Sequence, residues 1–453
     1  MRQDRLPGAV TAGWRSRLAA VALALLPLAA AAAAPGAAGV PETQVVLLAG
    51  VPAQAVVGWV GRAPQVASRV DPTRAVFAPD PELVLLGERL FNDPRLSRPR
   101  GMSCAACHDP GQAFGPSLAT PRALAGPGTS EGSRPGHFGA RTAPSLLYVR
   151  YVPRRHFYQD DDAPFASPFG GLFADGRADT LAEQIRGPLL DPREMNNGTP
   201  AQLLRSAQRS GLAAELAPRF GAAVQRDPEA LLRALGAALQ AFLQSDAMAP
   251  FSSRFDDYLR GQGTLSPAEQ RGLALFRNPD KGNCASCHTM AETASRPERS
   301  LLTDFGYDAI AVPRNRRLAD NRDPRHFDTG LDATARRLGW PEPGQWCAYL
   351  RTPSLRNVAV RQRFMHNAVF GDLRDAVAFY NTRSTDPAHW YAGGRPFDDV
   401  PHECRGNVNV NSPPMNRRAG TAAALSDAEI DDLVAFLRSL TDKAYAGRMP
   451  PAR

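Results

Sequence analysis

The sequence has little of what marks a nucleic-acid-binding protein or a protein embedded in a membrane. Its formal net charge is +8, but the arginines are scattered, with neither a Lys/Arg run nor a basic patch interleaved with aromatic residues. Beyond the N-terminal segment, no stretch is apolar enough to span a bilayer. Strand-like alternation is also scarce, so the sequence predicts a mainly α protein with a solvated basic surface. Docking of an acidic redox partner on that surface stays open.

The N-terminal segment has the form of a secretion signal. A basic stretch precedes an Ala-rich apolar run from Leu18 to about Ala34, and small residues suited to a signal peptidase follow. We therefore expect a signal peptide over residues 1–34 and export to the periplasm, with an uncleaved anchor as the alternative. Residues 35–78 have no clear period and are expected to form an N-terminal extension of unknown structure.

Two short segments carry the most specific chemistry of this chain: Cys104-Ala-Ala-Cys107-His108 and Cys284-Ala-Ser-Cys287-His288. Covalent haem attachment needs two thiols spaced to reach the two vinyl groups, and an adjacent His whose imidazole meets the iron. Both segments satisfy this requirement. The sequence thus predicts two covalently bound haem c groups, with His108 and His288 as proximal iron ligands. The alternatives are a zinc site of four thiolates and an exported redox dithiol.

The chain around these segments predicts two domains of similar build. A chain of 453 residues with a globular composition is long enough for two cores. The segment Gly87-Glu-Arg-Leu-Phe91 before the first haem segment matches Gly272-Leu-Ala-Leu-Phe276 before the second. We expect one haem domain over residues 79–250 and another over residues 262–445, with a linker from about 246 to 264.

Helical signals are clear in both halves. Apolar residues recur at helical spacing from Pro81 to Phe91 and from Pro228 to Ser245. Ser266 and Ser426 each begin a cap pattern with an acidic residue at the third helical position. The second cap opens a helix that ends near Leu440, and we expect this helix to pack on the helix that carries the second haem segment.

The six cysteines leave two outside the haem segments, Cys347 and Cys404. In an oxidising compartment they are expected to form a disulfide, with two unpaired thiols as the alternative. The disulfide would tie the loop before Arg351 to the loop before the C-terminal helix.

Several further segments resemble the bacterial di-haem cytochrome c peroxidases and their MauG-type relatives, over most of the chain from about residue 82 to 445. These segments are Leu86–Leu96, Phe173–Arg177, Glu183–Pro188, Glu194–Met195, Arg351–Asn357 and Ala376–Asn381. The resemblance implies two c-type cytochrome-like haem domains with long Pro- and Gly-rich loops. The N-terminal domain would be peroxidatic, and the C-terminal domain would transfer electrons.

The resemblance also implies catalytic residues at the N-terminal haem. Glu194 occupies the place of the acid that moves the proton during peroxide cleavage, Gln184 matches the distal Gln, and Pro188 lies between them. A carboxylate beside an open iron position can accept a proton from peroxide and return it to the departing oxygen. Without the resemblance, Gln184 and Glu194 would be ordinary surface residues.

The sixth ligand of the second haem separates the two branches of the family, because it is Met in typical peroxidases and Tyr in MauG-type members. The matching position here is Tyr380. An anionic oxygen ligand stabilises highly oxidised iron, as Tyr does in catalase, and this favours MauG-type chemistry. The alternative is that Met365 is the ligand and Tyr380 is a core aromatic of a helix over residues 373–381.

Two departures from the family pattern concern the region between the haems. The family usually has Trp at the position of Ala174, where it relays electrons, so fast transfer between the haems is not implied. The family's calcium site uses Asn where this chain has Thr142, and carbonyl groups at the positions of Arg361 and Arg363. Their guanidinium groups could supply the positive charge between the haem propionates instead, which leaves calcium binding open.

One histidine outside the haem segments has a counterpart in the family. His137 lies in a loop that resembles the one lending a removable ligand to the peroxidatic haem. It is either such a ligand or a surface histidine.

Three functional hypotheses follow. The first is a peroxidase that takes electrons from small cytochromes or copper proteins and reduces hydrogen peroxide to water. The second is a MauG-like enzyme that stores two oxidising equivalents over the haems and oxidises residues of a partner protein; Tyr380 favours it and Ala174 weakens it. The third is a non-enzymatic di-haem electron carrier, against which Glu194, Gln184 and Pro188 argue.

The haem segments lead to a direct test. The purified chain is expected to stain for haem on a denaturing gel and to exceed the apo mass by two haem groups. Replacing Cys104 and Cys107 with Ala should remove one haem, and replacing Cys284 and Cys287 should remove the other. A single haem in the unmodified chain, or zinc in place of haem, would contradict the assignment.

Overall fold

The computed structural model describes residues 78–117, 126–159, 166–291 and 296–451. These residues belong to one compact unit, Val51–Arg453. The expected signal peptide and all but the last residue of the expected extension lie outside the described residues. Within the described part of the chain, no helix has the length and apolar character needed to cross a membrane.

The described residues are mainly helical, which confirms the predicted fold class. The α-helices are α2 (Pro81–Phe91), α4 (Leu181–Leu190), α5 (Pro200–Arg209), α6 (Leu212–Phe220), α7 (Pro228–Leu243), α8 (Arg254–Leu259), α9 (Pro267–Arg277), α10 (Leu331–Leu338), α11 (Leu373–Thr382), α12 (Pro387–Trp390) and α13 (Asp427–Ser439). Two antiparallel strand pairs accompany them: β1 (His156–Tyr158) with β2 (Ser167–Phe169), and β3 (Tyr307–Asp308) with β4 (Leu350–Arg351). The long loops between them contain short 3-10 turns.

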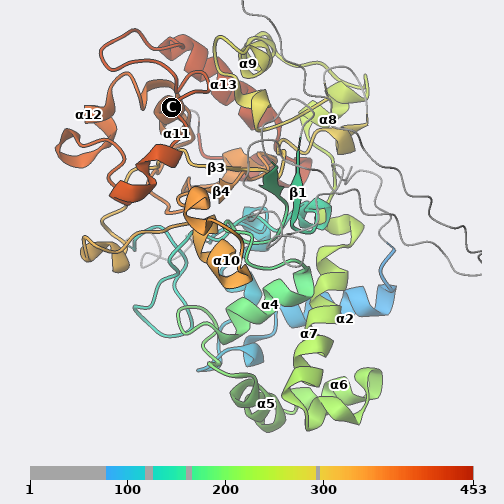
Figure 1. The fold of residues 1–453 in the computed structure, drawn as a ribbon. Coiled ribbons are helices and arrows are strands. Elements are labelled where there is room, and N and C mark those ends of the chain that lie inside the picture. Colours follow the sequence, from blue (N-terminus) through green and yellow to red (C-terminus); the bar gives the residue numbers. More distant parts are fainter. Residues whose placement is uncertain (1–77, 118–125, 160–165, 292–295, 452–453) are drawn as a thin grey trace, which may run out of the picture. The chain divides into compact units, whose positions relative to one another are not determined.

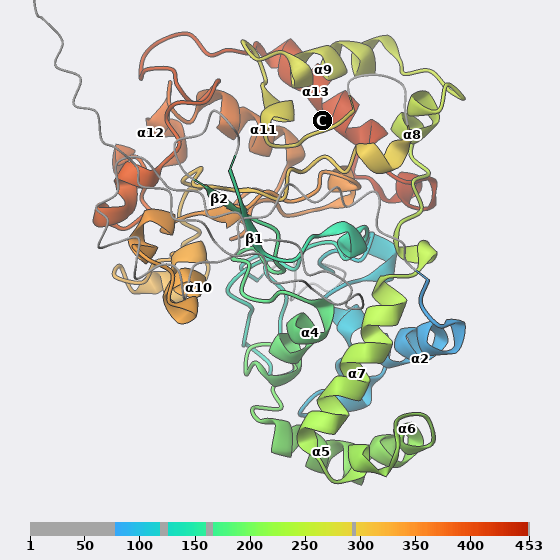
Figure 2. The ribbon, with the colours of Figure 1, turned by 45° about the vertical axis from the view of Figure 1, so that its right-hand side comes forward.

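Helix α7 is the centre of the first hydrophobic core. Its N-terminus is capped by Asp227, whose side chain accepts a hydrogen bond from Glu229 N, as expected of a capping aspartate. Leu231, Leu235 and Leu239 are fully buried because α7 packs against α2, α4, α5 and α6, as both ribbon views show (Figures 1 and 2). The predicted helix from residue 228 is confirmed and ends at Leu243.

Helices α9, α11 and α13 form the second hydrophobic core. Both predicted caps are confirmed, because Ser266 with Glu269 and Ser426 with Glu429 form reciprocal capping boxes. Helix α13 lies along α9, and α9 is the helix directly before the second haem segment. Helix α11 packs on α13 (Figure 1). The expected packing of the C-terminal helix is therefore confirmed.

Two glycines allow the closest helix contacts in these cores. A Cβ atom on Gly87 of α2 would lie 2.0 Å from Ala238 O of α7, and one on Gly272 of α9 would lie 2.0 Å from Asp432 O of α13. Since no side chain fits at such a distance, each helix pair can approach this closely only with glycine at the crossing. The repeated Gly-x-x-Leu-Phe segment is thus a repeated helix-packing element.

The phenylalanine that ends each repeat packs on the helix that the glycine of the same repeat contacts. The Phe91 ring lies 5.4 Å from the Phe242 ring, and the Phe276 ring lies 5.2 Å from the Phe436 ring. Each ring pair is tilted or edge-on, the arrangement that aromatic quadrupoles prefer. The α2–α7 and α9–α13 pairs are therefore equivalent units of the two halves, an equivalence of α7 with α13 that the sequence repeat did not reveal.

The segment expected to link the two halves is partly helical. It contains α8, in which Phe255 and Leu259 are buried in the second core. Asp256 on this helix forms a fully buried ion pair with Arg356 at 2.9 Å. The sequence did not predict α8, because a helix of six residues offers too few apolar positions for a helical period to be seen.

The predicted disulfide between Cys347 and Cys404 is confirmed, with a Cα–Cα distance of 5.6 Å. It ties the loop that leads into β4 to the 3-10 turn His402–Asn407.

The glycine crossings predict a large effect of adding one methyl group. Gly87→Ala and Gly272→Ala should each destabilise the fold by at least about 1–3 kcal/mol, because the backbones must separate to admit the Cβ atom. Gly447→Ala is the matched control, since its Cβ atom would meet nothing within 4 Å. Thermal unfolding followed by circular dichroism measures the difference, and equal midpoints for all three variants would contradict the packing argument.

Candidate functional site

One large cavity joins the two halves of the described chain. Its volume is about 1550 Å³, and its lining includes both Cys-x-x-Cys-His segments. A pocket for one small ligand typically encloses roughly 300–1,000 Å³. The size, the mostly apolar walls and the two attachment segments together fit two large planar cofactors.

The two histidines of these segments are oriented by backbone carbonyl groups. Nδ1 of His108 lies 3.0 Å from Pro144 O and 3.2 Å from Phe114 O. Nδ1 of His288 lies 3.0 Å from Leu302 O. A hydrogen bond from Nδ1–H leaves the unprotonated Nε2 for a metal, the usual arrangement of a histidine ligand. Burial lowers the pKa of His108 to about 4, which keeps its imidazole neutral.

The four thiols lie where both attachment segments turn. Each segment begins with a 3-10 turn. The backbone N–H of the histidine donates to the carbonyl of the first cysteine, at 2.9 Å for His108 and 2.8 Å for His288. All four sulfur-bearing residues line the cavity. Among the described residues, no three His, Cys, Asp or Glu side chains gather as a metal-binding group. The place of all four thiols on one large cavity fits two haem groups.

Helix α4 and the turn after it position the three expected catalytic residues. Gln184 and Pro188 are one helical turn apart on α4, hence on one face, and both line the cavity with Glu194. Two backbone hydrogen bonds fix the turn at Glu194. Met195 N donates to Pro188 O at 3.0 Å, and Ser133 N donates to Glu194 O at 2.7 Å. The structure thus brings together the three residues that the resemblance singled out.

The Glu194 carboxyl lies in an environment that favours its protonated form. Burial raises its pKa to about 7, and the nearby charge of Asp191 adds to the rise while Arg177 opposes it. A carboxyl group with a pKa near neutrality can both accept and donate a proton at physiological pH. This is the property that a proton shuttle requires.

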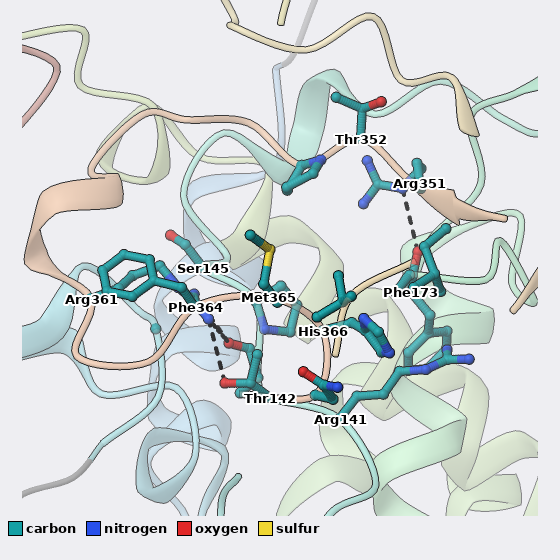
Figure 3. A pocket seen from close by; sticks show the side chains of 18 of the residues that line it. Arg141, Thr142, Ser145, Phe173, Arg351, Thr352, Arg361, Phe364, Met365 and His366 are labelled. Carbon is teal, nitrogen blue, oxygen red and sulfur yellow. Dashed lines mark hydrogen bonds between the residues drawn. The ribbon is translucent and has the colours of Figure 1, made fainter. Parts of the chain in front are cut away.

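Both candidate sixth ligands of the second haem line the cavity. Tyr380 is on α11 and packs against the second hydrophobic core, as does Cys284 of the second attachment segment. Met365 begins a turn, because Ala368 N donates to its carbonyl at 3.2 Å, and it has a left-handed backbone conformation, with φ at 67°. Figure 3 shows it among Thr142, Ser145 and His366, beside residues of the first half.

The backbone at Ala174 is bound to the second half of the chain. Arg351 N donates to Ala174 O at 2.8 Å, and Arg351 Nε donates to Phe173 O at 3.3 Å (Figure 3). Where the family usually has Trp, this chain therefore joins its two halves through one main-chain hydrogen bond and one bond from the Arg351 side chain.

A buried ionic cluster beside the cavity was not foreseen from the sequence. Arg141 pairs with Asp175 at 2.7 Å and with Asp328 at 2.6 Å, and Nε2 of His366 lies 3.8 Å from Asp328. The opposite charge of Arg141 holds the pKa of Asp328 well below its usual range despite burial. No local signal could have revealed the cluster, because its members are far apart in the chain.

The remaining candidate residues fall at two places. His137 is exposed at the rim of the cavity, where its Nδ1 lies 3.3 Å from the guanidinium of Arg134; its role as a removable ligand stays a prediction. Arg361 lies inside the cavity and donates to Thr142 Oγ1 and to Arg363 O. Two of the oxygens expected around calcium, Thr142 Oγ1 and Arg363 O, thus accept hydrogen bonds from a guanidinium group.

Fold and cavity together define a class, a mainly helical protein with one large cavity lined by two Cys-x-x-Cys-His segments. Residues 81–264 match the family model described as di-haem cytochrome c peroxidase. The chain is 36% identical to the methylamine utilization protein MauG of Paracoccus denitrificans over 387 residues, 83% of this chain and 92% of that protein. The chain belongs to the di-haem cytochrome c peroxidase and MauG family, whose members are oxidoreductases.

Two further relatives lie on the peroxidase side. The cytochrome c551 peroxidase of Pseudomonas aeruginosa is 29% identical over 327 residues, 68% of this chain and 78% of that protein. The crystal structure of the diheme peroxidase BthA from Burkholderia thailandensis matches with a TM-score of 0.83 and 70% identity, over 86% of this chain and 93% of that chain. The likeness covers both halves of the cavity.

Proposed function

We propose that this chain is a periplasmic di-haem c-type peroxidase, which reduces hydrogen peroxide at the N-terminal haem with electrons passed through the C-terminal haem. The observation that carries the proposal is Glu194, a carboxyl group with a near-neutral pKa inside the cavity that also holds the first attachment segment. The name of the similar diheme peroxidase supports the same reaction.

The proposed roles follow from the positions of the side chains. The four cysteines would hold two haem c groups, His108 and His288 would be iron ligands, and the N-terminal haem would supply the iron at which peroxide is reduced. Glu194 accepts the proton from the oxygen nearer the iron and returns it to the farther oxygen, which leaves as water. Two electrons and two protons convert one peroxide into two water molecules. Gln184 and Pro188, which share one face of α4, line the space next to Glu194.

The proposed location rests on the N-terminal sequence pattern and on the disulfide. A disulfide persists in an oxidising compartment such as the periplasm, and Cys347 and Cys404 are joined. The electron donor would be a small cytochrome or copper protein.

Glu194→Gln is the main test of this function. The amide keeps the size of the side chain but cannot shuttle a proton, so the absorbance change caused by peroxide should slow by at least roughly tenfold. In the unmodified protein, the same rate should fall as the pH falls through about 7, because the protonated Glu194 cannot accept the proton. Stopped-flow mixing with peroxide over a pH series measures both effects.

The matched control is Glu183→Gln, the same chemical change at an exposed position of α4 outside the cavity lining. It should leave the rate and its pH dependence unchanged. An unaltered rate in Glu194→Gln with two haems bound would remove the catalytic assignment.

One observation favours MauG-type oxidation of a partner protein as a second candidate. Tyr380 packs against the second hydrophobic core, as does Cys284 of the second attachment segment, and an oxygen ligand there would suit a haem that holds an oxidising equivalent. The 36% identity to MauG points the same way. Turnover with a reduced small cytochrome favours the peroxidase, whereas peroxide-dependent oxidation of a partner's aromatic residues favours the alternative.

Replacing the two candidate ligands separately decides the ligation. Tyr380→Phe should change the low-spin ferric absorption spectrum and raise the potential of the C-terminal haem, because an anionic donor that stabilises ferric iron is lost. Met365→Leu, a volume-conserving change, should leave the spectrum unchanged. The reverse pattern would establish methionine ligation and the peroxidase-type arrangement.

A further inference from the structure

The guanidinium of Arg361 is held by neutral oxygen atoms contributed by both halves of the chain. Nε donates to Arg363 O at 3.2 Å, NH1 to Ala143 O at 3.3 Å, and NH2 to Ala143 O at 3.2 Å and Thr142 Oγ1 at 3.4 Å. Figure 3 shows the side chain reaching across the cavity wall to Thr142. The positive charge is thus fixed in position.

No carboxylate of the described residues forms an ion pair with this guanidinium. Burial is the cause that lowers its pKa to about 10, with no acidic group opposing the shift. Two buried arginines are paired, Arg356 with Asp256 at 2.9 Å and Arg314 with Asp399 at 2.7 Å. The buried Arg383, which does not line the cavity, donates instead to the carbonyl groups of Ile310 and Asn409. An unpaired charge away from water is costly. Arg361 faces the cavity, so its counter-ion is expected among the groups that the cavity binds.

A calcium ion does not fit beside this guanidinium. Calcium takes six to eight oxygen ligands, several of them usually anionic. Here Thr142 Oγ1, Ala143 O and Arg363 O accept hydrogen bonds from Arg361, so the oxygens available for an ion already bind a cation.

We propose that Arg361 is the resident cation at the junction of the two halves, that it pairs with carboxylates of the haem groups, and that no calcium binds there. The inference rests on the proposed function only in requiring that both haems are bound. A planar guanidinium is suited to pairing with carboxylates, and it stays charged at any physiological pH.

The position of Arg361 also connects it to the N-terminal haem. Ala143, which holds the guanidinium, precedes Pro144, whose carbonyl accepts the Nδ1 hydrogen bond of His108 at 3.0 Å. A positive charge near a haem favours the ferrous over the ferric state. Removing the charge should therefore be visible in a haem potential without any measurement of turnover.

Three variants of the holoprotein separate charge from structure. Arg361→Met removes the charge and keeps an unbranched side chain, and Arg361→Lys restores the charge. Arg209→Met, the same change at an exposed position of α5 outside the cavity lining, is the control. Spectroelectrochemical titration gives both haem potentials, and metal analysis gives the calcium content before and after dialysis against a calcium chelator.

In Arg361→Met the ratio of ferric to ferrous haem at a given applied potential should rise about tenfold. This corresponds to a haem potential lower by about 59 mV for a one-electron couple. Arg361→Lys should recover most of the shift, and Arg209→Met should match the unmodified protein. The unmodified protein should contain less than stoichiometric calcium, and neither chelator nor added calcium chloride should move its potentials.

Stoichiometric calcium whose removal shifts a potential would overturn the inference, as would unchanged potentials in Arg361→Met. These failures are distinct from failure of the proposed function, because haem content and reaction with peroxide are measured on the same unmodified sample. A protein with two haems and calcium-dependent potentials would refute the role of Arg361 and leave the peroxidase proposal intact.

Discussion

Each half of the cavity depends on a helix crossing that has no room for a side chain. At Gly87 and at Gly272 the backbones of paired helices meet so closely that a Cβ atom would lie 2.0 Å from a carbonyl oxygen. Interiors are packed as densely as organic crystals, so such a crossing transmits a fixed geometry to its surroundings. It directs Phe91 and Phe276 onto the partner helices and fixes where each haem segment begins.

A buried polar centre then joins the two halves. The Asp442 carboxylate accepts hydrogen bonds from Tyr148 OH at 2.8 Å, Asn357 Nδ2 at 2.7 Å and Ser252 N at 2.8 Å. Tyr148 belongs to the first core, whereas Asn357 follows the Arg351–Arg356 segment of the second half. Because each buried polar atom would be costly if left unpaired, this centre allows one relative placement of the two cores.

That placement explains how one cavity acquires two chemically different ends. Near the first attachment segment, α4 and its following turn present Glu194 in a setting that raises its pKa. Near the second segment, α11 presents the phenol of Tyr380. The helix-pair architecture of the halves is the same, and the difference lies in which side chains the loops and neighbouring helices bring to each haem.

Features that depend on short spacing could be predicted from the sequence by itself. Two thiols and a histidine in five residues specify haem attachment locally, and a Ser followed by an acid three residues later specifies a helix start. The disulfide followed from elimination among six cysteines. Glu194 and Tyr380 came from resemblance alone, because a lone carboxyl or phenol has no local pattern that distinguishes it from a surface or core residue.

Only the tertiary structure decided the rest. Helix α8 forms because Phe255 and Leu259 are buried by residues distant in the chain. The pairing of Arg141 with Asp328, and the enclosure of Arg361 by oxygens from residues 142 and 143, join positions about two hundred residues apart. Such contacts depend on which surfaces the helix crossings bring together, and no spacing within a single segment encodes them.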